Sequence, residues 1–147
     1  MKRGKWKIKT SEKAYPIKPR IWSLDRADNE FSLYIRNRDG RCMYPGCLVT
    51  DIKKLQCSHY WGRTHKGTRF EPDNCIALCW PHHFKDKLRG WEYKKQLAGE
   101  FQHDGEYTVY MKKWLGKKRF NELQAIARSA MPQSDSIISC MRLLGKL

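Results

Sequence analysis

Residues 57–83 read CSHYWGRTHKGTRFEPDNCIALCWPHH, and this stretch narrows the possible folds more than any other. It places His59, Asn74 and His83 in that order, with a basic loop between the first two. Two cysteines precede the stretch, and Cys79 and His82 stand at its end. Cysteine and histidine at such short spacing are the usual protein ligands of zinc. The stretch therefore predicts a small domain built around metal ligands.

The charge of the chain indicates a polyanionic partner. Its 147 residues include 30 Lys and Arg against 15 Asp and Glu, a formal net charge of +15. We expect nucleic acid to be that partner. An anionic membrane surface is the rival, but the basic residues are scattered rather than gathered on one amphipathic helix. Charge alone does not identify the function, because many small basic proteins bind polyanions nonspecifically.

The six cysteines predict metal binding in a reducing compartment. The first residues, MKRGKWKIKT, have no apolar core of a secretory signal. No segment approaches the roughly 18 apolar residues that span a bilayer. Cysteines that alternate with histidines at ligand spacing are typical of cytosolic metal sites. We therefore expect a cytoplasmic protein with reduced thiols and no membrane partner.

The pattern of apolar and polar residues predicts a single α+β domain. Residues 1–24 are basic and favour an extended arm, either a solubilising tail or a segment lying along phosphates. Residues 25–130 form the domain with its C-terminal helices, and residues 131–147 form a C-terminal tail. Within the domain we expect a helix over 25–39 that ends at Gly40, followed by a turn over 41–50, a strand pair over 52–60 and a loop over 61–73. The main helix is expected over 74–88, capped by Asp73 or Asn74 and ended by Gly90. Three short helices should follow over 91–130, with a break at residues 116–118.

Two ligand pairs predict a structural zinc site. Four residues separate Cys42 from Cys47, and two separate Cys79 from His82. Such pairs are typical of structural zinc. A shared ion would clamp the upstream turn onto the main helix, and the free energy of metal binding would then stabilise the fold.

Two other cysteines compete for this role. Cys75 could replace Cys79 with a small shift along the chain. A buried free thiol is the commoner outcome for Cys57, which lies on the predicted strand. The remaining alternative is that all six cysteines are core thiols, and Cys140 is given no role.

The order of His59, Asn74 and His83 predicts a hydrolytic site for phosphodiesters. Hydrolysis needs a base for the attacking water and a cation for the phosphate charge. His59 ends a strand-like segment, where a neutral imidazole suits the base. Asn74 could hold the loop through its amide, orient His59, or only cap the helix. His83 lies about 100° round the helix from His82, so the two can serve different metal ions.

The loop between His59 and Asn74 carries a candidate DNA-binding surface. Arg63, Lys66 and Arg69 lie along it and would meet phosphates as the scissile strand enters. The alternative is a solvated basic loop. His65 lies in the same loop and could be a second metal ligand, a phosphate donor or a solvent-facing imidazole.

Four blocks of the chain resemble a known family. They are FSLYIRNRD at residues 31–39, LQCSHY at 55–60, TRFEPDN at 68–74, and LC at 78–79. Over roughly residues 25–115 the chain resembles the HNH (ββα-metal) endonucleases, most of all the phage recombination endonucleases of the NinG (Rap) type. The resemblance implies a ββα-metal core with a structural zinc and flanking helices. It also implies that His59 is the general base, Asn74 the middle asparagine and His83 the metal-binding histidine.

The chain departs from the family pattern at two positions. HNH enzymes often carry Asp or Glu directly before the base histidine as a metal ligand, and Ser58 stands there instead. The catalytic ion would then be held by His83, by a group such as His65, or by substrate oxygens and water. His82 stands where a cysteine is usual, which zinc tolerates.

These features predict an HNH endonuclease that hydrolyses DNA phosphodiester bonds with a structural Zn²⁺ and a catalytic Mg²⁺ or Mn²⁺. Branched or flapped DNA in phage recombination is implied by the resemblance alone, and a phage-encoded protein would act in the host cytoplasm. The alternative, favoured by Ser58, is a non-catalytic zinc-stabilised DNA-binding protein on the same scaffold. An RNA-directed or host-factor-binding protein is a third possibility that rests only on charge. The sequence gives no prediction of oligomeric state or of sequence preference.

Overall fold

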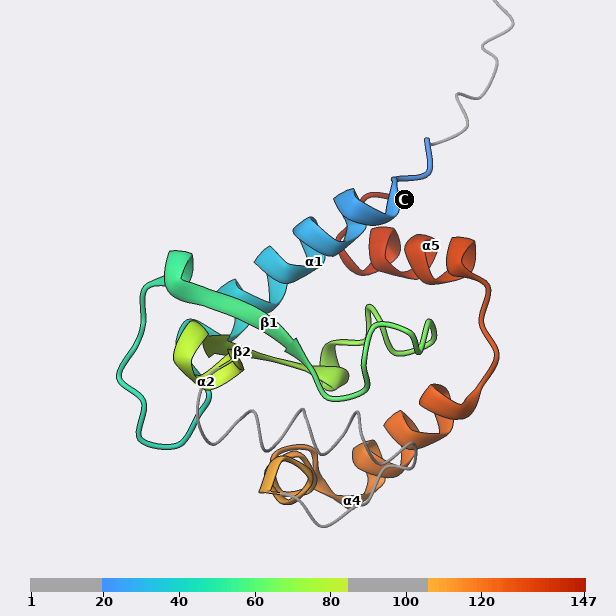
Figure 1. Cartoon of the computed structure of the whole chain (residues 1–147). Coiled ribbons are helices and arrows are strands. Elements are labelled where there is room, and N and C mark those ends of the chain that lie inside the picture. Colours follow the sequence, from blue (N-terminus) through green and yellow to red (C-terminus); the bar gives the residue numbers. More distant parts are fainter. Residues whose placement is uncertain (1–19, 85–105) are drawn as a thin grey trace, which may run out of the picture.

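A long helix, a two-stranded sheet and two C-terminal helices make up the part of the chain that the structure describes (Figure 1). The structure is a computed structural model that describes residues 20–84 and 106–147. Most of the predicted basic arm, the stop at Gly90 and the helix expected after it lie outside these residues. None of the described helices combines the length and the apolar character that crossing a membrane requires.

Helix α1 (Leu24–Asp39) confirms the helix predicted over residues 25–39. The Ser23 side chain accepts a hydrogen bond from the Arg26 backbone N–H and so caps the first turn. Gly40 ends the helix with φ 64°, a left-handed conformation that glycine adopts without a steric penalty. The buried face of α1 consists of Ala27, Phe31 and Ile35.

The sheet pairs two strands that are distant in sequence. Strands β1 (Leu55–His59) and β2 (Cys75–Cys79) are antiparallel, with His59 opposite Cys75. The predicted strand pair within residues 52–60 is therefore wrong, because residues 52–54 form a 3₁₀ turn, η1 (Ile52–Lys54), and the partner strand lies elsewhere.

The start of the predicted main helix is also wrong. Residues 75–79 form β2, and helix α2 (Trp80–Phe84) begins only at Trp80. All five residues of β2 are buried, and a short continuous apolar run fits a buried strand as well as a helix. Asn74 lies in a second 3₁₀ turn, η2 (Pro72–Asn74), and Asp73 pairs with Arg119 instead of capping a helix.

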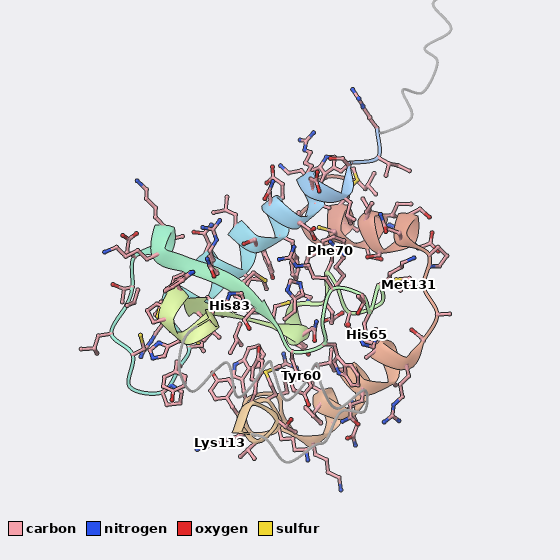
Figure 2. All side chains as sticks on the ribbon, viewed as in Figure 1. Tyr60, His65, Phe70, His83, Lys113 and Met131 are labelled. Atoms are coloured by element: carbon pink, nitrogen blue, oxygen red, sulfur yellow. The ribbon has the colours of Figure 1, made fainter. Side chains whose placement is uncertain are left out.

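The sheet is covered on both faces (Figure 1). Helix α1 packs on one face, where Cys57, Cys75 and Phe70 join its buried side chains. Helix α4 (Glu106–Arg128) covers the other face, towards which Tyr60 projects (Figure 2). The α+β class is confirmed, in the form of one small sheet between helices.

Both C-terminal helices contribute to the core. The expected break in α4 is confirmed at Gly116, whose φ of 75° and ψ of 164° are accessible essentially only to glycine. Helix α5 (Gln133–Leu143) lies within the segment expected to be a C-terminal tail and packs against α1. Its buried residues are Ser136, Ile137, Cys140 and Met141.

Candidate metal centre and active site

The structure brings together the four residues predicted to bind zinc. The ligand atoms of Cys42, Cys47, Cys79 and His82 all lie within 4.8 Å of one another. His82 Nδ1 is 3.0 Å from Cys79 Sγ and 3.5 Å from Cys42 Sγ, and Cys47 Sγ is 3.8 Å from Cys79 Sγ. Two sulfurs that bind one zinc ion at about 2.3 Å in a tetrahedron lie about 3.8 Å apart. The group can therefore hold a metal ion, and its donor set suits zinc.

Backbone hydrogen bonds hold the upstream half of this cluster in place. The Cys42 N–H donates to the Val49 carbonyl over 2.8 Å, and the Met43 N–H donates to the Ala77 carbonyl over 2.8 Å, which ties the turn to β2. Gly46 takes φ 80° and lets the chain turn back towards Cys47. The ligand positions are thus set by the turn and the strand.

The Tyr44 ring stacks on the His82 imidazole, with 4.1 Å between ring centroids and 10° between ring planes. This contact orients the imidazole and shields the cluster on that side. The sequence analysis missed Tyr44, for which the only signal was its place between the two cysteines of the turn.

The two cysteines of the turn differ in acidity. Burial raises the pKa of the Cys42 thiol to about 12. Burial also acts to raise the pKa of Cys47, but hydrogen bonds from the Val49 backbone and the neighbouring thiols, together with the charge of Arg41, lower it overall. Metal binding at such a site requires thiolates and releases protons.

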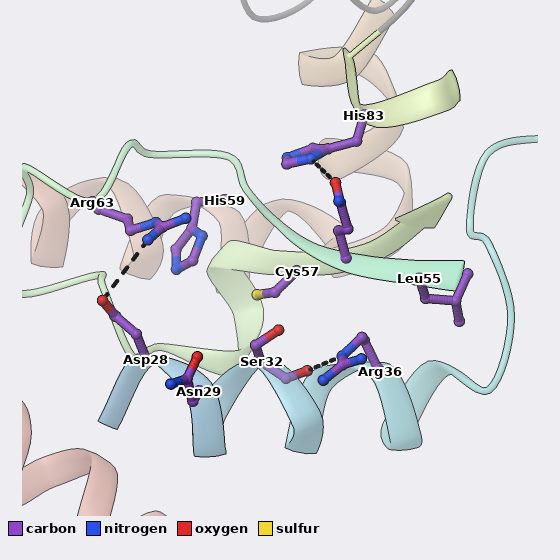
Figure 3. Close-up of a pocket in the computed structure, with 10 residues that line it drawn as sticks. Asp28, Asn29, Ser32, Arg36, Leu55, Cys57, His59, Arg63 and His83 are labelled. Carbon is purple, nitrogen blue, oxygen red and sulfur yellow. Dashed lines mark hydrogen bonds and ion pairs between the residues drawn. The ribbon is translucent and has the colours of Figure 1, made fainter. Parts of the chain in front are cut away.

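A second group of polar side chains surrounds a cavity of about 370 Å³ (Figure 3). The cavity lies where α1, β1 and α2 meet. His59 and His83, the predicted base and the predicted metal ligand, both line it. The other polar residues of its wall are Asp28, Asn29, Ser32, Arg36, Gln56 and Arg63.

His59 ends β1, as predicted, and its imidazole is half-buried at the cavity wall. Its Nε2 lies 2.9 Å from the Arg69 backbone carbonyl, which can only accept a hydrogen bond. Nε2 therefore carries the proton of the neutral ring, and the lone pair is on Nδ1. The Phe31 ring, 6.2 Å away between centroids, supports one side of the imidazole.

His83 is oriented in a comparable way. Its Nδ1 donates to the Gln56 side-chain carbonyl over 2.7 Å (Figure 3). The proton on Nδ1 leaves the lone pair of the neutral ring on Nε2. Metal-binding histidines usually donate their second ring N–H to an oxygen in this manner. The sequence analysis missed Gln56, which lies two residues before Ser58 on β1.

Asn74 holds the loop that follows β1. Its buried amide donates to the Trp61 carbonyl over 2.9 Å and to the Thr68 carbonyl over 3.0 Å, and it accepts from the Trp61 N–H over 2.7 Å. Of the alternatives for Asn74, the structure supports the loop-holding role. The helix cap is wrong, because α2 begins six residues later, at Trp80.

The basic residues of the loop differ in how tightly they are held. Arg69 is bound to Asp28 of α1 through two hydrogen bonds, of 2.9 and 2.6 Å, and its side chain is only 15% exposed. The Arg63 side chain is 58% exposed and lies 3.8 Å from the same carboxylate. Lys66 is exposed. Phosphate binding by all three stays a prediction.

Two polar side chains of this region face α4. His65 Nδ1 donates to the Ala127 carbonyl over 3.3 Å, and its ring packs against Trp61, so the expected solvent-facing position is wrong. Ser58 is almost fully buried, and its hydroxyl lies 3.3 Å from the Tyr107 hydroxyl. Neither residue lines the cavity.

Cys57 and Cys75 are buried on the sheet face that carries His59. Cys57 is a buried thiol, as expected. The alternative in which Cys75 replaces Cys79 as a ligand is wrong, because Cys79 lies in the four-residue cluster and Cys75 lies in a separate group with Cys57 and His59.

No protein-family model matches this chain, and no curated protein or solved structure shows significant similarity to it.

Proposed function

We propose that this protein is a metal-dependent endonuclease of the HNH type that hydrolyses DNA phosphodiester bonds. One observation carries the proposal. His59 and His83 line the same cavity, and each imidazole is oriented by a hydrogen bond to a carbonyl oxygen. The chain order β1, loop, β2 and α2 agrees with the order of elements that the HNH resemblance implies, and this supports the proposal.

His59 is the general base in this proposal. Its Nδ1 takes a proton from the attacking water while Nε2 stays bonded to the Arg69 carbonyl. The carbonyl dipole also favours the imidazolium that forms. Asn74 acts at a distance, because it holds the loop that delivers the Arg69 carbonyl.

His83 would hold the catalytic ion together with water and substrate oxygens, because Arg69 already binds both oxygens of Asp28. Mg²⁺ uses few protein carboxylates and keeps several waters, and Mn²⁺ accepts imidazole as well as oxygen ligands. The donor set fits an ion that keeps most of its water shell. Such an ion, when bound, neutralises charge on the phosphate.

The charge of the chain supports DNA as the substrate. The net charge of +15 favours a polyanion, and the exposed Arg63 stands at the cavity wall, where a phosphate would approach. Branched or flapped DNA, and a role in phage recombination, rest on the NinG-type resemblance.

A cleavage assay on supercoiled plasmid with Mg²⁺ or Mn²⁺ tests the proposal. His59→Ala should lower the cleavage rate by on the order of 10²–10⁴, the usual contribution of a general base. His65→Ala is the matched control, because it removes an imidazole that faces α4. Zinc bound at the four-residue cluster and DNA binding should be the same in both variants. Cleavage that survives His59→Ala would remove His59 as the base.

A non-catalytic DNA-binding protein is the second candidate, and a specific observation favours it. Asp28 is the one carboxylate among the described residues of the cavity wall, and Arg69 already holds it through both oxygens. DNA binding without cleavage in any divalent metal would support this candidate. Affinity should then fall with salt by a log–log slope of about 0.9 per neutralised phosphate.

A further inference from the structure

Three side chains on the α1 face of the sheet form a group that the proposed nuclease chemistry does not explain. We propose that Cys57, His59 and Cys75 form a second metal site, selective for a soft divalent ion such as Zn²⁺. The ligand atoms of the three residues lie within 4.8 Å of one another, which also holds for the four-residue cluster.

The strand register places the three ligands together. Cys57 and His59 are two residues apart on β1, so their side chains leave the same face of the sheet. Cys75 stands directly opposite His59 on β2. Ligand sulfurs around one zinc ion lie about 3.8 Å apart. The distances between the three ligand atoms therefore need to shorten by no more than about 1 Å for an ion to bind.

The surroundings suit a dithiolate site. A divalent cation that replaces two thiol protons forms a centre with no net charge, and both protons pass to solvent. Cys57 and Cys75 pack among apolar side chains that include Phe31 and Phe70. A neutral centre costs much less to bury there than a bare ion would.

The second ring nitrogen of His59 is already held. Nε2 donates to the Arg69 carbonyl, which leaves the lone pair of the neutral ring on Nδ1 as the nitrogen that can bind a metal ion. Cys57 and His59 also line the cavity, so water has access to a fourth position on the ion. Three protein ligands with one open position are typical of zinc sites that are not purely structural.

The site has a consequence for catalysis that rests on the proposed function. The lone pair of His59 Nδ1 cannot bind a metal ion and accept a proton from water at the same time. An ion held by Cys57, His59 and Cys75 therefore switches the proposed base off. The protein would be inhibited by Zn²⁺ while Mg²⁺ or Mn²⁺ supports cleavage.

Cobalt titration of the full chain, after removal of bound zinc and under reductant, tests the metal site without an activity assay. Co²⁺ bound to thiolates gives charge-transfer absorption, so sites can be counted. We expect two equivalents for the unmodified protein and for Cys140→Ser, and one for Cys57→Ser. A count of one in the unmodified protein overturns the site. Cys75→Ser serves as the second variant if Cys57→Ser does not melt cooperatively.

Inhibition by Zn²⁺ tests the shared imidazole. In Mg²⁺-supported cleavage, Cys57→Ser should need at least roughly tenfold more Zn²⁺ for half-inhibition than Cys140→Ser, since tenfold corresponds to about 1.4 kcal/mol of lost affinity. Equal inhibition of both variants overturns the link to His59. If no variant cleaves DNA, the nuclease proposal fails, and the cobalt count still decides whether the site exists.

Discussion

Two neighbouring histidines of α2 belong to two different sites. His82 joins three cysteines whose positions are fixed by a turn and a strand, whereas His83 lines a cavity with residues of α1. The cluster has the composition of a site that stabilises a fold, with every ligand atom close to the others. The cavity has two imidazoles, each oriented by a hydrogen bond, and a volume of about 370 Å³. The proposed structural role and the proposed catalytic role thus fall on consecutive residues of α2.

The cluster should show the largest effect of any single change. Cys79→Ser removes a ligand at the junction of β2 and α2, so zinc should be lost and cooperative melting with it. Zinc binding supplies about 10–16 kcal/mol in small zinc domains, which exceeds the stability of most domains of this size. Metal analysis and thermal melting by near-UV circular dichroism measure both outcomes.

Cys140→Ser is the matched control for that prediction. Cys140 is a buried thiol on α5 and belongs to neither metal-binding group among the described residues. Its substitution should leave the zinc content unchanged. A Cys79→Ser variant that melts like Cys140→Ser would show that the cluster does not stabilise the fold.

The comparison of the two histidines gives the next largest effect. His83→Ala should lower cleavage by more than the roughly 10–100-fold that loss of an outer-shell partner costs, while zinc content and melting stay unchanged. His82→Ala should have the opposite primary effect, because it should lose zinc and become less stable. Plasmid cleavage assays and metal analysis of both variants test this prediction. Two variants with the same behaviour would contradict the division between the sites.

Asn74 should show an intermediate effect, on stability. Its amide makes three hydrogen bonds to backbone groups, each contributing about 0.5–1.5 kcal/mol, so Asn74→Ala should cost about 2–4 kcal/mol. Asn121→Ala, on the exposed side of α4, should change the free energy of unfolding by no more than about 0.5 kcal/mol. Urea denaturation of both variants compares them. A small effect at Asn74 would mean that the loop is held by other contacts.

The two sites also differ in how much of them the sequence predicts. The cluster is built from two short ligand pairs, and their spacing predicted Cys42, Cys47, Cys79 and His82, with Cys75 as the alternative to Cys79 that the structure removes. The α1 boundaries and the break at Gly116 were likewise predicted, because capping and glycine conformations are local. The error at residues 74–79 has a physical cause, since five buried apolar residues in a row carry no period that separates a strand from a helix.

The cavity was harder to predict because its wall comes from distant parts of the chain. Asp28 lies 31 positions before His59 in sequence, and no local pattern marks it as a neighbour of that histidine. Gln56 carries no signal until the fold places it beside His83. Pairing of β1 with β2 and packing of α1 on the sheet are tertiary events, and local propensity does not encode them.

The smallest expected effect separates the two arginines that meet at Asp28. Arg63 is largely exposed, so Arg63→Ala should leave melting unchanged and reduce the salt slope of DNA binding by about 0.9, one phosphate contact. Arg69 is mostly buried and joins the loop to α1, so Arg69→Ala should lower the melting temperature instead. Fluorescence anisotropy at several salt concentrations, with melting curves, measures both. If Arg69→Ala alone changed the salt slope, the phosphate contact would belong to the ion-paired arginine, and Asp28 would have to release it when DNA binds.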